Sequence, residues 1–323
     1  MTAPPLIVIA GATATGKTGL AIRLAEWLAG QGKPAEIISA DSRQVFRGLD
    51  IGTAKVTAAD RARVPHHGID LVDPDQPFSV ADFVRNAREA LAGIVERDGV
   101  AILAGGTGLY LRAVARGLDA DALPTDPDLR ARLEAQLETE GLEPMVRRLR
   151  EIAPTQADRV DLRNSRRVVR ALEIAELRGD AGPPAPLGYN GPSTWIGLTV
   201  DAPMHARWIA ERARAQFEAG LVEEARTLRK RFDPGLPAFS AIGYREAWAV
   251  LDGELSRDAA IELDARRNVA FAKRQRTWFR SEPGITWIDA TTGVPDTAAH
   301  QAVSSLLDGL VSSPRSRSTG SPQ

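Results

Sequence analysis

A phosphate-binding pattern stands near the start of the chain. Residues 11–18 fit the spacing G-x-x-x-x-G-K-[ST] and read Gly11-Ala12-Thr13-Ala14-Thr15-Gly16-Lys17-Thr18. Glycines let the backbone N–H groups of such a loop surround a phosphate, and the side chain of Lys17 adds a positive charge. The hydroxyl of Thr18 is a suitable ligand for Mg²⁺ on the same phosphate. The sequence therefore predicts a diphosphate or triphosphate site, but the pattern does not indicate which reaction uses it.

A carboxylate and a hydroxyl follow two other apolar runs. Asp41 comes directly after residues 37–40, and Thr107 follows residues 100–106, which read Val-Ala-Ile-Leu-Ala-Gly-Gly. Open α/β sheets bind ligands at the carboxyl ends of parallel strands, so both side chains are expected beside the phosphate loop. There Asp41 is a candidate general base, and Thr107 is a hydroxyl that can orient the same nucleophile. Two simpler roles stay open, a turn cap for Asp41 and a helix cap for Thr107.

An acidic residue is missing where many P-loop hydrolases and kinases have one. In those enzymes an acid at the end of a hydrophobic strand helps to hold Mg²⁺. Here the run at residues 100–104 continues into Gly105-Gly106-Thr107 instead. A small-molecule or nucleotide kinase remains the alternative function, with Asp41 or Asp73 as the missing ligand.

The elements that must position these residues alternate between strand and helix. An apolar-periodic stretch over Lys17–Leu28 predicts a helix after the loop, and Ser79 with Asp82 can cap a second helix that runs toward Arg97. Short apolar runs predict three strands in this part of the chain, at Leu6–Ala10, Glu36–Ala40 and Val100–Ala104. Such alternation favours a parallel sheet, so we predict an α/β fold of the P-loop type with flanking helices.

The pattern changes after Gly117. Asp126-Pro127 is a good helix start, and the residues up to about Arg178 are helical in pattern with no strand-like segment. A stretch rich in glycine and proline then leads back to strand candidates at Thr194–Val200 and Ile285–Ile288. We predict a catalytic core from residues 1–117 and 193–311, an all-helical insertion domain at 118–192 and a disordered tail at 312–323.

Composition excludes several kinds of chemistry. The 323 residues include no cysteine, so a disulfide, a thiolate nucleophile and a cysteine-ligated metal are all excluded. No apolar run approaches the roughly 20 residues that cross a bilayer, and no cleavable leader is evident, so we expect a cytoplasmic protein without membrane contact. The net charge is −1, yet residues 265–280 hold six cations and no acid. This stretch predicts a local basic surface of the kind that binds nucleic acid.

Several motifs follow the phosphate loop in a fixed order. They are Ser39-Ala40-Asp41-Ser42-Arg43-Gln44, Asp50-Ile51-Gly52-Thr53-Ala54-Lys55, Gly105-Gly106-Thr107-Gly108-Leu109-Tyr110, Arg170-Ala171-Leu172-Glu173, Ile242-Gly243-Tyr244-Arg245-Glu246 and Ala272-Lys273-Arg274-Gln275-Arg276-Thr277-Trp278-Phe279-Arg280. As a set they resemble the bacterial tRNA dimethylallyltransferases, also called tRNA isopentenyltransferases, over nearly the whole chain to about Ala290. The chain departs from the commoner family pattern at Arg163-Asn164-Ser165, where an Asn-Asp-Pro type of turn is usual.

The resemblance implies a reaction and roles for the motif residues. The phosphate loop would hold dimethylallyl diphosphate with Mg²⁺, and the exocyclic amine of the adenosine on the 3′ side of the anticodon would attack the allylic carbon. The family's base corresponds to Asp41, and the hydroxyl that orients the amine corresponds to Thr107. A further arginine of the family contacts the diphosphate, and Arg212 aligns with it most naturally, with Arg207 and Arg214 close by.

The resemblance also implies a tRNA partner for a monomeric enzyme. Residues expected to contact tRNA are Asp41, Ser42, Arg43, Gln44, Thr107, Arg130, Arg166, Arg167, Val168, Val169, Arg170, Gly243, Tyr244, Arg245, Lys273, Arg274, Arg276 and Arg280. Lys273, Arg276 and Arg280 recur at three- and four-residue spacing, which places them on one helix face. Binding through such a face falls steeply with salt concentration.

Other interpretations of single features stay open. An isopentenyltransferase acting on free adenine nucleotides would not need the insertion or the basic stretch, and an RNA-binding protein with a vestigial loop would make no product. His66-His67 favours a packing role over metal binding, because no third ligand is evident. Trp278 is a candidate either for stacking on a base or for a place in the core.

Overall fold

The computed structural model describes residues 3–119, 124–181, 185–293 and 296–311. Within these residues the chain forms two compact units. The first consists of the residues up to Arg116 together with those from Gly188 onward, and the second is Gly117–Leu187. The tail predicted to be disordered, residues 312–323, lies outside the described residues.

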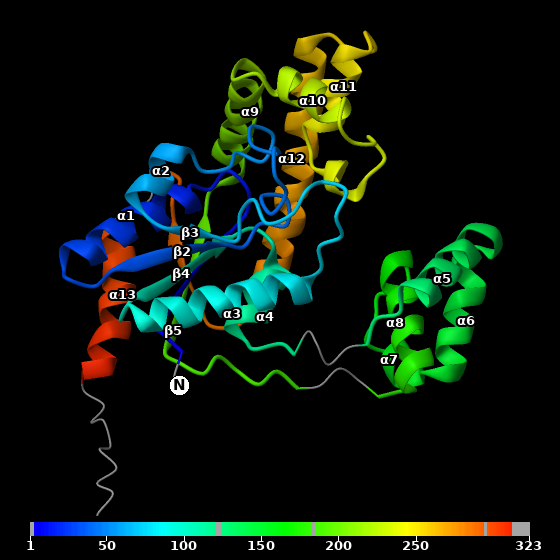
Figure 1. The fold of residues 1–323 in the computed structure, drawn as a ribbon, viewed down its shortest axis with the longest axis horizontal. Helices are drawn as coiled ribbons and strands as arrows, with labels where there is room; N and C mark the ends of the chain where they lie inside the picture. Colours follow the sequence, from blue (N-terminus) through cyan, green and yellow to red (C-terminus); the bar gives the residue numbers. More distant parts are fainter. Residues whose placement is uncertain (1–2, 120–123, 182–184, 294–295, 312–323) are drawn as a thin grey trace, which may run out of the picture. The chain divides into compact units, whose positions relative to one another are not determined.

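A six-stranded parallel sheet forms the centre of the first unit (Figure 1). Its strand order is β3-β2-β4-β1-β5-β6. The strands are β1 (Leu6–Gly11), β2 (Ala35–Ser39), β3 (His66–His67), β4 (Val100–Gly105), β5 (Ser193–Thr199) and β6 (Ile285–Asp289). Every residue of β1, β2 and β4 is buried, which explains why these strands appear in the sequence as continuous apolar runs. The predicted α/β fold with a parallel sheet is confirmed.

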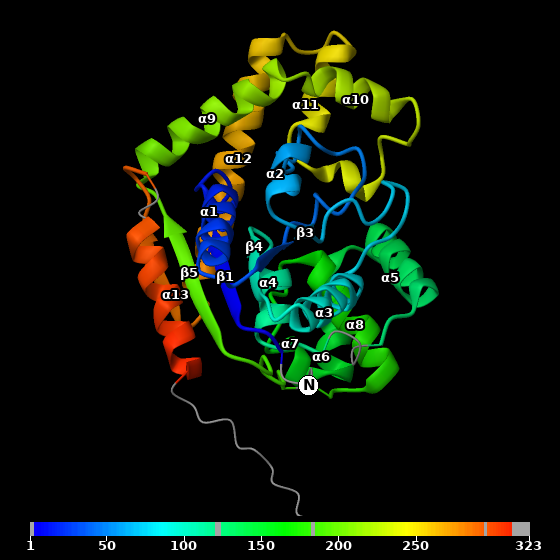
Figure 2. The same ribbon diagram turned by 60° about the vertical axis from the view of Figure 1, so that its left-hand side comes forward.

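Helices cover the sheet and extend beyond one of its ends. Those of the first unit are α1 (Lys17–Gly30), α2 (Ala58–Arg63), α3 (Val80–Glu96), α4 (Gly108–Ala115), α9 (Ala202–Glu218), α10 (Leu221–Arg229), α11 (Tyr244–Leu251), α12 (Arg257–Arg280) and α13 (Asp296–Val311), with a 3₁₀ turn η1 (Pro237–Ser240). Side chains of α1 and α13 share one core with the strands, and the ribbon of α13 runs beside β5 (Figure 2). A second core joins α9 to α12 with residues that follow β2, among them Val45, Phe46 and Leu49.

Two helix starts follow from the capping residues that the sequence indicated. Ser79 and Asp82 form a reciprocal capping box at the start of α3, so this helix begins and ends as predicted. The side chain of Asp126 accepts hydrogen bonds from the backbone of Asp128 and Leu129 and thereby caps α5 (Pro127–Glu140).

The second unit contains helices and no strand in its described residues. Besides α5 it contains α6 (Leu142–Ile152), α7 (Pro154–Ala157) and α8 (Ser165–Arg178), which enclose a core of their own around Leu133, Leu149 and Leu172. The unit ends at Leu187 and not at the predicted residue 192. The reason is that the next residues bind to the start of β1: the Tyr189 hydroxyl donates to the Pro4 carbonyl, and Asn190 O accepts from Ala3 N.

None of the helices in the described residues is long and apolar enough to cross a bilayer.

Candidate active site

A cavity of about 280 Å³ opens at the carboxyl edge of the sheet. The phosphate loop lines it through residues 13–19, and the ends of β2 and β4 line it through Ser39, Asp41 and Ala104–Gly106. Thr53 and Ala54, Arg212 from α9, and Phe271 and Gln275 from α12 complete the wall. The cavity therefore occupies the edge where open parallel sheets bind their ligands.

All of the phosphate loop except its first two residues lines this cavity. Gly16 takes a left-handed conformation at the start of α1, where no side chain caps the first backbone N–H groups. A helix N-terminus of this kind favours an anion. Gly11 and Ala12, which the sequence also suggested as diphosphate ligands, do not line the cavity. Gly11 ends β1, and the Ala12 carbonyl accepts hydrogen bonds from Thr15 Oγ1 at 2.9 Å and Lys17 Nζ at 2.6 Å.

Two cations face the same space. Burial lowers the pKa of Lys17 to about 7, with a further lowering by Arg212 that Asp41 opposes. Burial also lowers the pKa of Arg212, whose Nη1 donates to Thr13 Oγ1 at 2.8 Å. A bound anion would relieve the repulsion between these two cations, so the pair suits a diphosphate.

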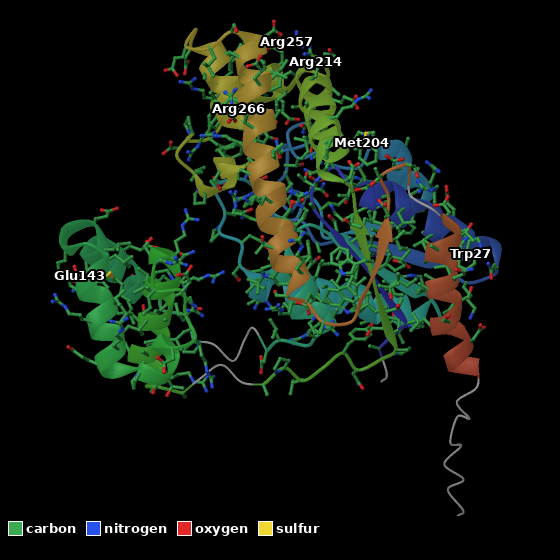
Figure 3. The ribbon with its side chains drawn as sticks, turned by 180° about the vertical axis from the view of Figure 1, so that it is seen from behind. Trp27, Glu143, Met204, Arg214, Arg257 and Arg266 are labelled. Atoms are coloured by element: carbon green, nitrogen blue, oxygen red, sulfur yellow. The ribbon has the colours of Figure 1, made fainter. Side chains whose placement is uncertain are left out.

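Arg212 is the arginine of α9 that reaches the cavity. Of the two neighbours considered from the sequence, Arg207 is exposed and pairs with Glu211 at 2.7 Å. Arg214 of α9, which is labelled in Figure 3, is also exposed. Neither of them lines the cavity. The geometry thus favours Arg212 as the diphosphate-contacting arginine.

Asp41 and Thr107 are tied to one turn after β2. Oδ1 of Asp41 accepts from Arg43 N at 2.8 Å and from Gln44 N at 3.4 Å, so this carboxylate does cap the turn. Its Oδ2 makes no hydrogen bond with a described residue, and the side chain lines the cavity. Thr107 Oγ1 accepts from Ser42 N at 3.0 Å and does not cap α4. The hydroxyl proton of Thr107 is therefore available to a ligand near Asp41.

Glycine is required where the β4 turn packs against its neighbours. A Cβ atom at Gly105 would overlap the carbonyl of Ala40, and one at Gly108 would overlap the ring of Trp278. Trp278 is half-buried, and the guanidinium of Arg112 lies 4.3 Å from its ring centroid. This tryptophan packs on α4, so the structure supports its packing role over base stacking.

Two polar side chains near the loop were not identified from the sequence. Gln275 of α12 accepts a hydrogen bond from Thr13 N at 2.8 Å, and its Nε2 donates to Gly106 O at 2.9 Å. His205 of α9 lies with Nε2 at 2.7 Å from Thr13 O. No local pattern distinguishes them from other helical residues, because both contacts join segments far apart in the sequence.

The structure corrects several expected tRNA contacts. The side chains of Val168 and Val169 lie in the core of the second unit, and Tyr244 is buried with its hydroxyl bonded to Glu224. These three side chains cannot reach RNA. Consecutive residues of a helix point in different directions, so some members of a contiguous motif face the core. Exposed residues among the expected tRNA contacts are Arg166, Arg167, Arg245, Lys273, Arg274 and Arg280.

Two further expected contacts serve an internal ion-pair network. Glu173 is completely buried in the second unit and pairs with Arg130 and Arg170, each at 2.7 Å. Hydrogen bonds from Arg170 and Arg130 lower the pKa of Glu173 against the opposing effect of its burial. Both arginines are only partly exposed, at 37% and 32% of their side-chain surface. Their first role is therefore to neutralise this buried acid.

The basic surface of α12 is narrower than the sequence indicated. Arg267 pairs with the buried Glu246, and Arg266, labelled in Figure 3, lies 3.6 Å from Glu262. In the described part of the chain the remaining cations of this stretch make no ion pair. They are Lys273, Arg274, Arg276 and Arg280, of which Arg276 is half-buried and the others exposed.

The paired histidines have structural partners. His66 Nδ1 lies 2.7 Å from the Val64 carbonyl, and His67 Nε2 lies 2.7 Å from Glu36. Among the described residues no cluster of three or more acidic or imidazole groups could hold a metal ion. The structure therefore supports packing roles for both histidines.

Asp264 is an unusual buried acid on α12. It is 1% exposed, and Asn268 Nδ2 donates to its Oδ1 at 2.7 Å, while Oδ2 has no hydrogen-bond partner. Burial raises the pKa of Asp264 to about 6, and the charge of Glu246 adds to this effect. Between about pH 4 and pH 6 the folded protein thus holds a proton at Asp264 that the unfolded chain, with an ordinary pKa near 3.8, has already lost.

We predict that Asp264→Asn stabilises the fold at neutral pH. Because the folded-state pKa is raised, wild-type stability falls as pH rises from about 4 through 6, whereas an amide carries no such cost. The variant should gain about 1–3 kcal/mol in unfolding free energy at pH 7.5 and less at pH 4.5. Urea titrations of both proteins at the two pH values measure this, and a difference independent of pH would contradict it.

Comparisons with known proteins point to one family. The family model described as IPP transferase matches residues 44–282. The tRNA dimethylallyltransferase of Thermus thermophilus is 45% identical over 282 residues, covering 86% of this chain and 90% of that protein. The same-named protein of Nocardioides sp. is 41% identical over 312 residues, covering 94% and 97%.

Solved structures show the same similarity. A tRNA isopentenylpyrophosphate transferase from Bacillus halodurans is 38% identical with a TM-score of 0.69, covering 94% of this chain and 97% of its own. A eukaryotic dimethylallyltransferase acting on tRNA shares the fold with a TM-score of 0.75 at 23% identity, covering 98% of this chain and 81% of its own.

Proposed function

The chain belongs to the IPP transferase family, and from this premise we propose how its active site works. The protein is an enzyme, a prenyltransferase that moves a dimethylallyl group from dimethylallyl diphosphate to an adenosine of tRNA. We assign the acceptor as the exocyclic N6 amine of the adenosine on the 3′ side of the anticodon. The observation that carries the proposed active site is the convergence of Lys17, Arg212 and Asp41 on one cavity at the phosphate loop.

Diphosphate binding is assigned to the loop and its two cations. Residues 14–18, which include the start of α1, line the cavity, and Lys17 and Arg212 stand on its wall. As the allylic C–O bond breaks, the bonding electrons leave with the diphosphate. The growing negative charge is stabilised by donors that are already in place, which is the main source of catalysis in such sites.

Proton transfer is assigned to Asp41, with Thr107 as its partner. The amine nitrogen of the adenosine forms a bond to the allylic carbon and must then lose a proton. Oδ2 of Asp41 is free of hydrogen bonds to described residues and can accept this proton. The Thr107 hydroxyl, held by Ser42 N, can bind and orient the adenine edge beside it.

Mg²⁺ is proposed as the cofactor. The residues fit this ion, because Mg²⁺ in nucleotide sites takes few protein ligands and completes its shell with waters and substrate phosphates. Thr18 lines the cavity with an exposed hydroxyl and would hold the ion. When bound, the ion would neutralise charge on the departing diphosphate.

Each unit offers exposed cationic side chains for the tRNA. In the first unit these lie on α12 and at Arg245, and in the second unit at Arg166 and Arg167. The target base must leave the stack of the anticodon loop to enter the cavity, as base-modifying enzymes generally require. We place the enzyme in the cytoplasm as a monomer, with tRNA and dimethylallyl diphosphate as its substrates.

A product assay tests the proposed function. Purified protein, Mg²⁺, dimethylallyl diphosphate and unmodified tRNA are incubated, the RNA is digested, and fragments are analysed by mass spectrometry. A dimethylallyl-adenosine confined to the anticodon-loop fragment is expected, and it should be absent when that adenosine is replaced by guanosine. ATP-dependent phosphorylation without this product would overturn the proposal in favour of a kinase.

Salt dependence tests the basic surface of α12. Lys273→Ala removes an exposed cation, so tRNA binding should weaken and the slope of log K against log salt concentration should fall by about one. Filter binding at several salt concentrations measures the slope. Lys230→Ala, an exposed lysine at the end of α10, is the matched control and should leave the slope unchanged. An unchanged slope for Lys273→Ala would make that helix face an ordinary solvated surface.

A further inference from the structure

Thr13 is held by three side chains from two helices that come late in the chain. Its N–H donates to Gln275 of α12, its carbonyl contacts His205 Nε2 of α9, and its hydroxyl oxygen accepts from Arg212 of α9. The three distances are 2.8, 2.7 and 2.8 Å. Every polar atom of Thr13 is therefore bonded to protein, and little water competes because His205 is 2% exposed and Gln275 is 7% exposed.

The partner atoms define the state of His205. A carbonyl oxygen can only accept, so the Nε2 atom that contacts Thr13 must carry the hydrogen. Burial lowers the pKa of His205, and the nearby charges of Arg276 and Lys17 act in the same direction, against the hydrogen bond to Thr13. His205 is thus a neutral donor that adds no charge to the cation pair of the cavity.

These bonds fix the two peptide planes that flank Thr13. The first plane is the peptide between Ala12 and Thr13. Gln275 accepts from its N–H group, and its carbonyl oxygen, which belongs to Ala12, accepts from Lys17 and Thr15. His205 holds the oxygen of the second plane, which leads into Ala14. Ala14 has φ 59°, in the left-handed region that is unfavourable for a residue with a Cβ atom. Such a conformation persists only where the surroundings determine it.

We propose that His205 and Gln275 are positioning residues that keep the phosphate loop in the conformation that binds the diphosphate of the substrate. The proposal rests on the proposed function for the identity of this ligand. Gln275 also donates to Gly106 O, so the same amide ties the loop to the turn after β4 that carries Thr107. The loop is therefore held in place by helices α9 and α12 and not by its own sequence alone.

Binding of dimethylallyl diphosphate with Mg²⁺, measured by calorimetry without tRNA, tests the proposal directly. His205→Phe keeps the ring and removes the donor, and Gln275→Met keeps the length and removes both bonds. His205→Phe should raise the Kd about tenfold, as expected for one lost buried hydrogen bond, and Gln275→Met, which loses two such bonds, should raise it by at least about tenfold. In both variants the Kd for tRNA should change by less than about twofold. His205→Gln places an amide donor near the position of Nε2 and should restore most of the affinity.

A matched control separates positioning from general stability. Gln156 is a buried glutamine of the second unit whose Nε2 donates to the Gly179 carbonyl at 2.9 Å. Gln156→Met should lower the thermal midpoint to a similar degree as Gln275→Met and leave the Kd for dimethylallyl diphosphate unchanged. If Gln275→Met and His205→Phe behave like this control, their role is only structural and the proposal is wrong.

A double-mutant cycle identifies the route of the His205 effect. Glycine adopts the φ of Ala14 without penalty, so in an Ala14→Gly background the loop depends less on the bond from His205. His205→Phe should then raise the Kd only about threefold. An undiminished tenfold effect would overturn the link through Ala14.

The wild-type protein separates this proposal from the proposed function. Wild-type protein that binds the diphosphate but makes no modified tRNA would refute the proposed function alone, and wild-type protein that fails to bind it would refute both.

Discussion

Asp41→Asn is expected to lower the turnover number about 10²–10⁴-fold, the usual contribution of a general base. The amide keeps an oxygen for the bonds that Arg43 N and Gln44 N make with Oδ1, so the turn after β2 should keep its shape. What is lost is the group that accepts the proton of the adenosine amine. Single-turnover kinetics with saturating tRNA and dimethylallyl diphosphate measure the chemical step, and tRNA affinity should stay within about threefold of wild type.

Asp73→Asn is the matched control for this prediction. Asp73 lies in the same unit and pairs with Arg47 at 3.6 Å, and its side chain is 44% exposed. It was the other acid considered as a metal ligand for a kinase, and near-normal transfer by Asp73→Asn would show that the transferase reaction does not need it. Near-normal turnover of Asp41→Asn would remove Asp41 as the base.

Lys17→Met is expected to lower kcat/KM about 10²–10³-fold, the typical loss when one preorganised donor to a developing anion is removed. Methionine keeps much of the apolar stem, so the buried part of the side chain stays packed. In the free enzyme Lys17 has a pKa of about 7, because burial and Arg212 both oppose its charge. Wild-type affinity for dimethylallyl diphosphate should therefore weaken as pH rises above 7, and this dependence should be smaller in the variant.

Lys33→Met is the control for Lys17→Met, because it also replaces a lysine by methionine. Lys33 precedes β2, at the edge of the sheet opposite the cavity, so its loss should change kcat/KM by less than about twofold. Product formation by Lys17→Met at the wild-type rate would show that the lysine does not act on the diphosphate.

Much of the fold could be predicted from local sequence. The strands β1, β2 and β4 are buried on both faces, and such strands leave continuous apolar runs that are easily recognised. The capping box at Ser79 is equally local. The phosphate loop was recognised because its spacing is set by backbone geometry within eight consecutive residues, 11–18.

The site was only partly predictable, for physical reasons. Asp41 and Arg212 were identified, but a family motif does not reveal which faces of a helix are buried, so Val168, Val169 and Tyr244 were wrongly expected to contact RNA. The bonds of Gln275 to Thr13 and Gly106 span 262 and 169 residues of sequence. No local pattern encodes such contacts, since they depend on how α12 docks on the finished sheet.

The strand order has a consequence for synthesis on the ribosome. β1 pairs with both β4 and β5, yet the whole of the second unit, Gly117–Leu187, is translated between these two partners. That unit has its own core and only local helix contacts, so it can fold while β1 still has one open edge. The helical module can thus fold before the sheet is complete, and on our proposal the phosphate loop takes its binding conformation only after α9 and α12 have left the exit tunnel.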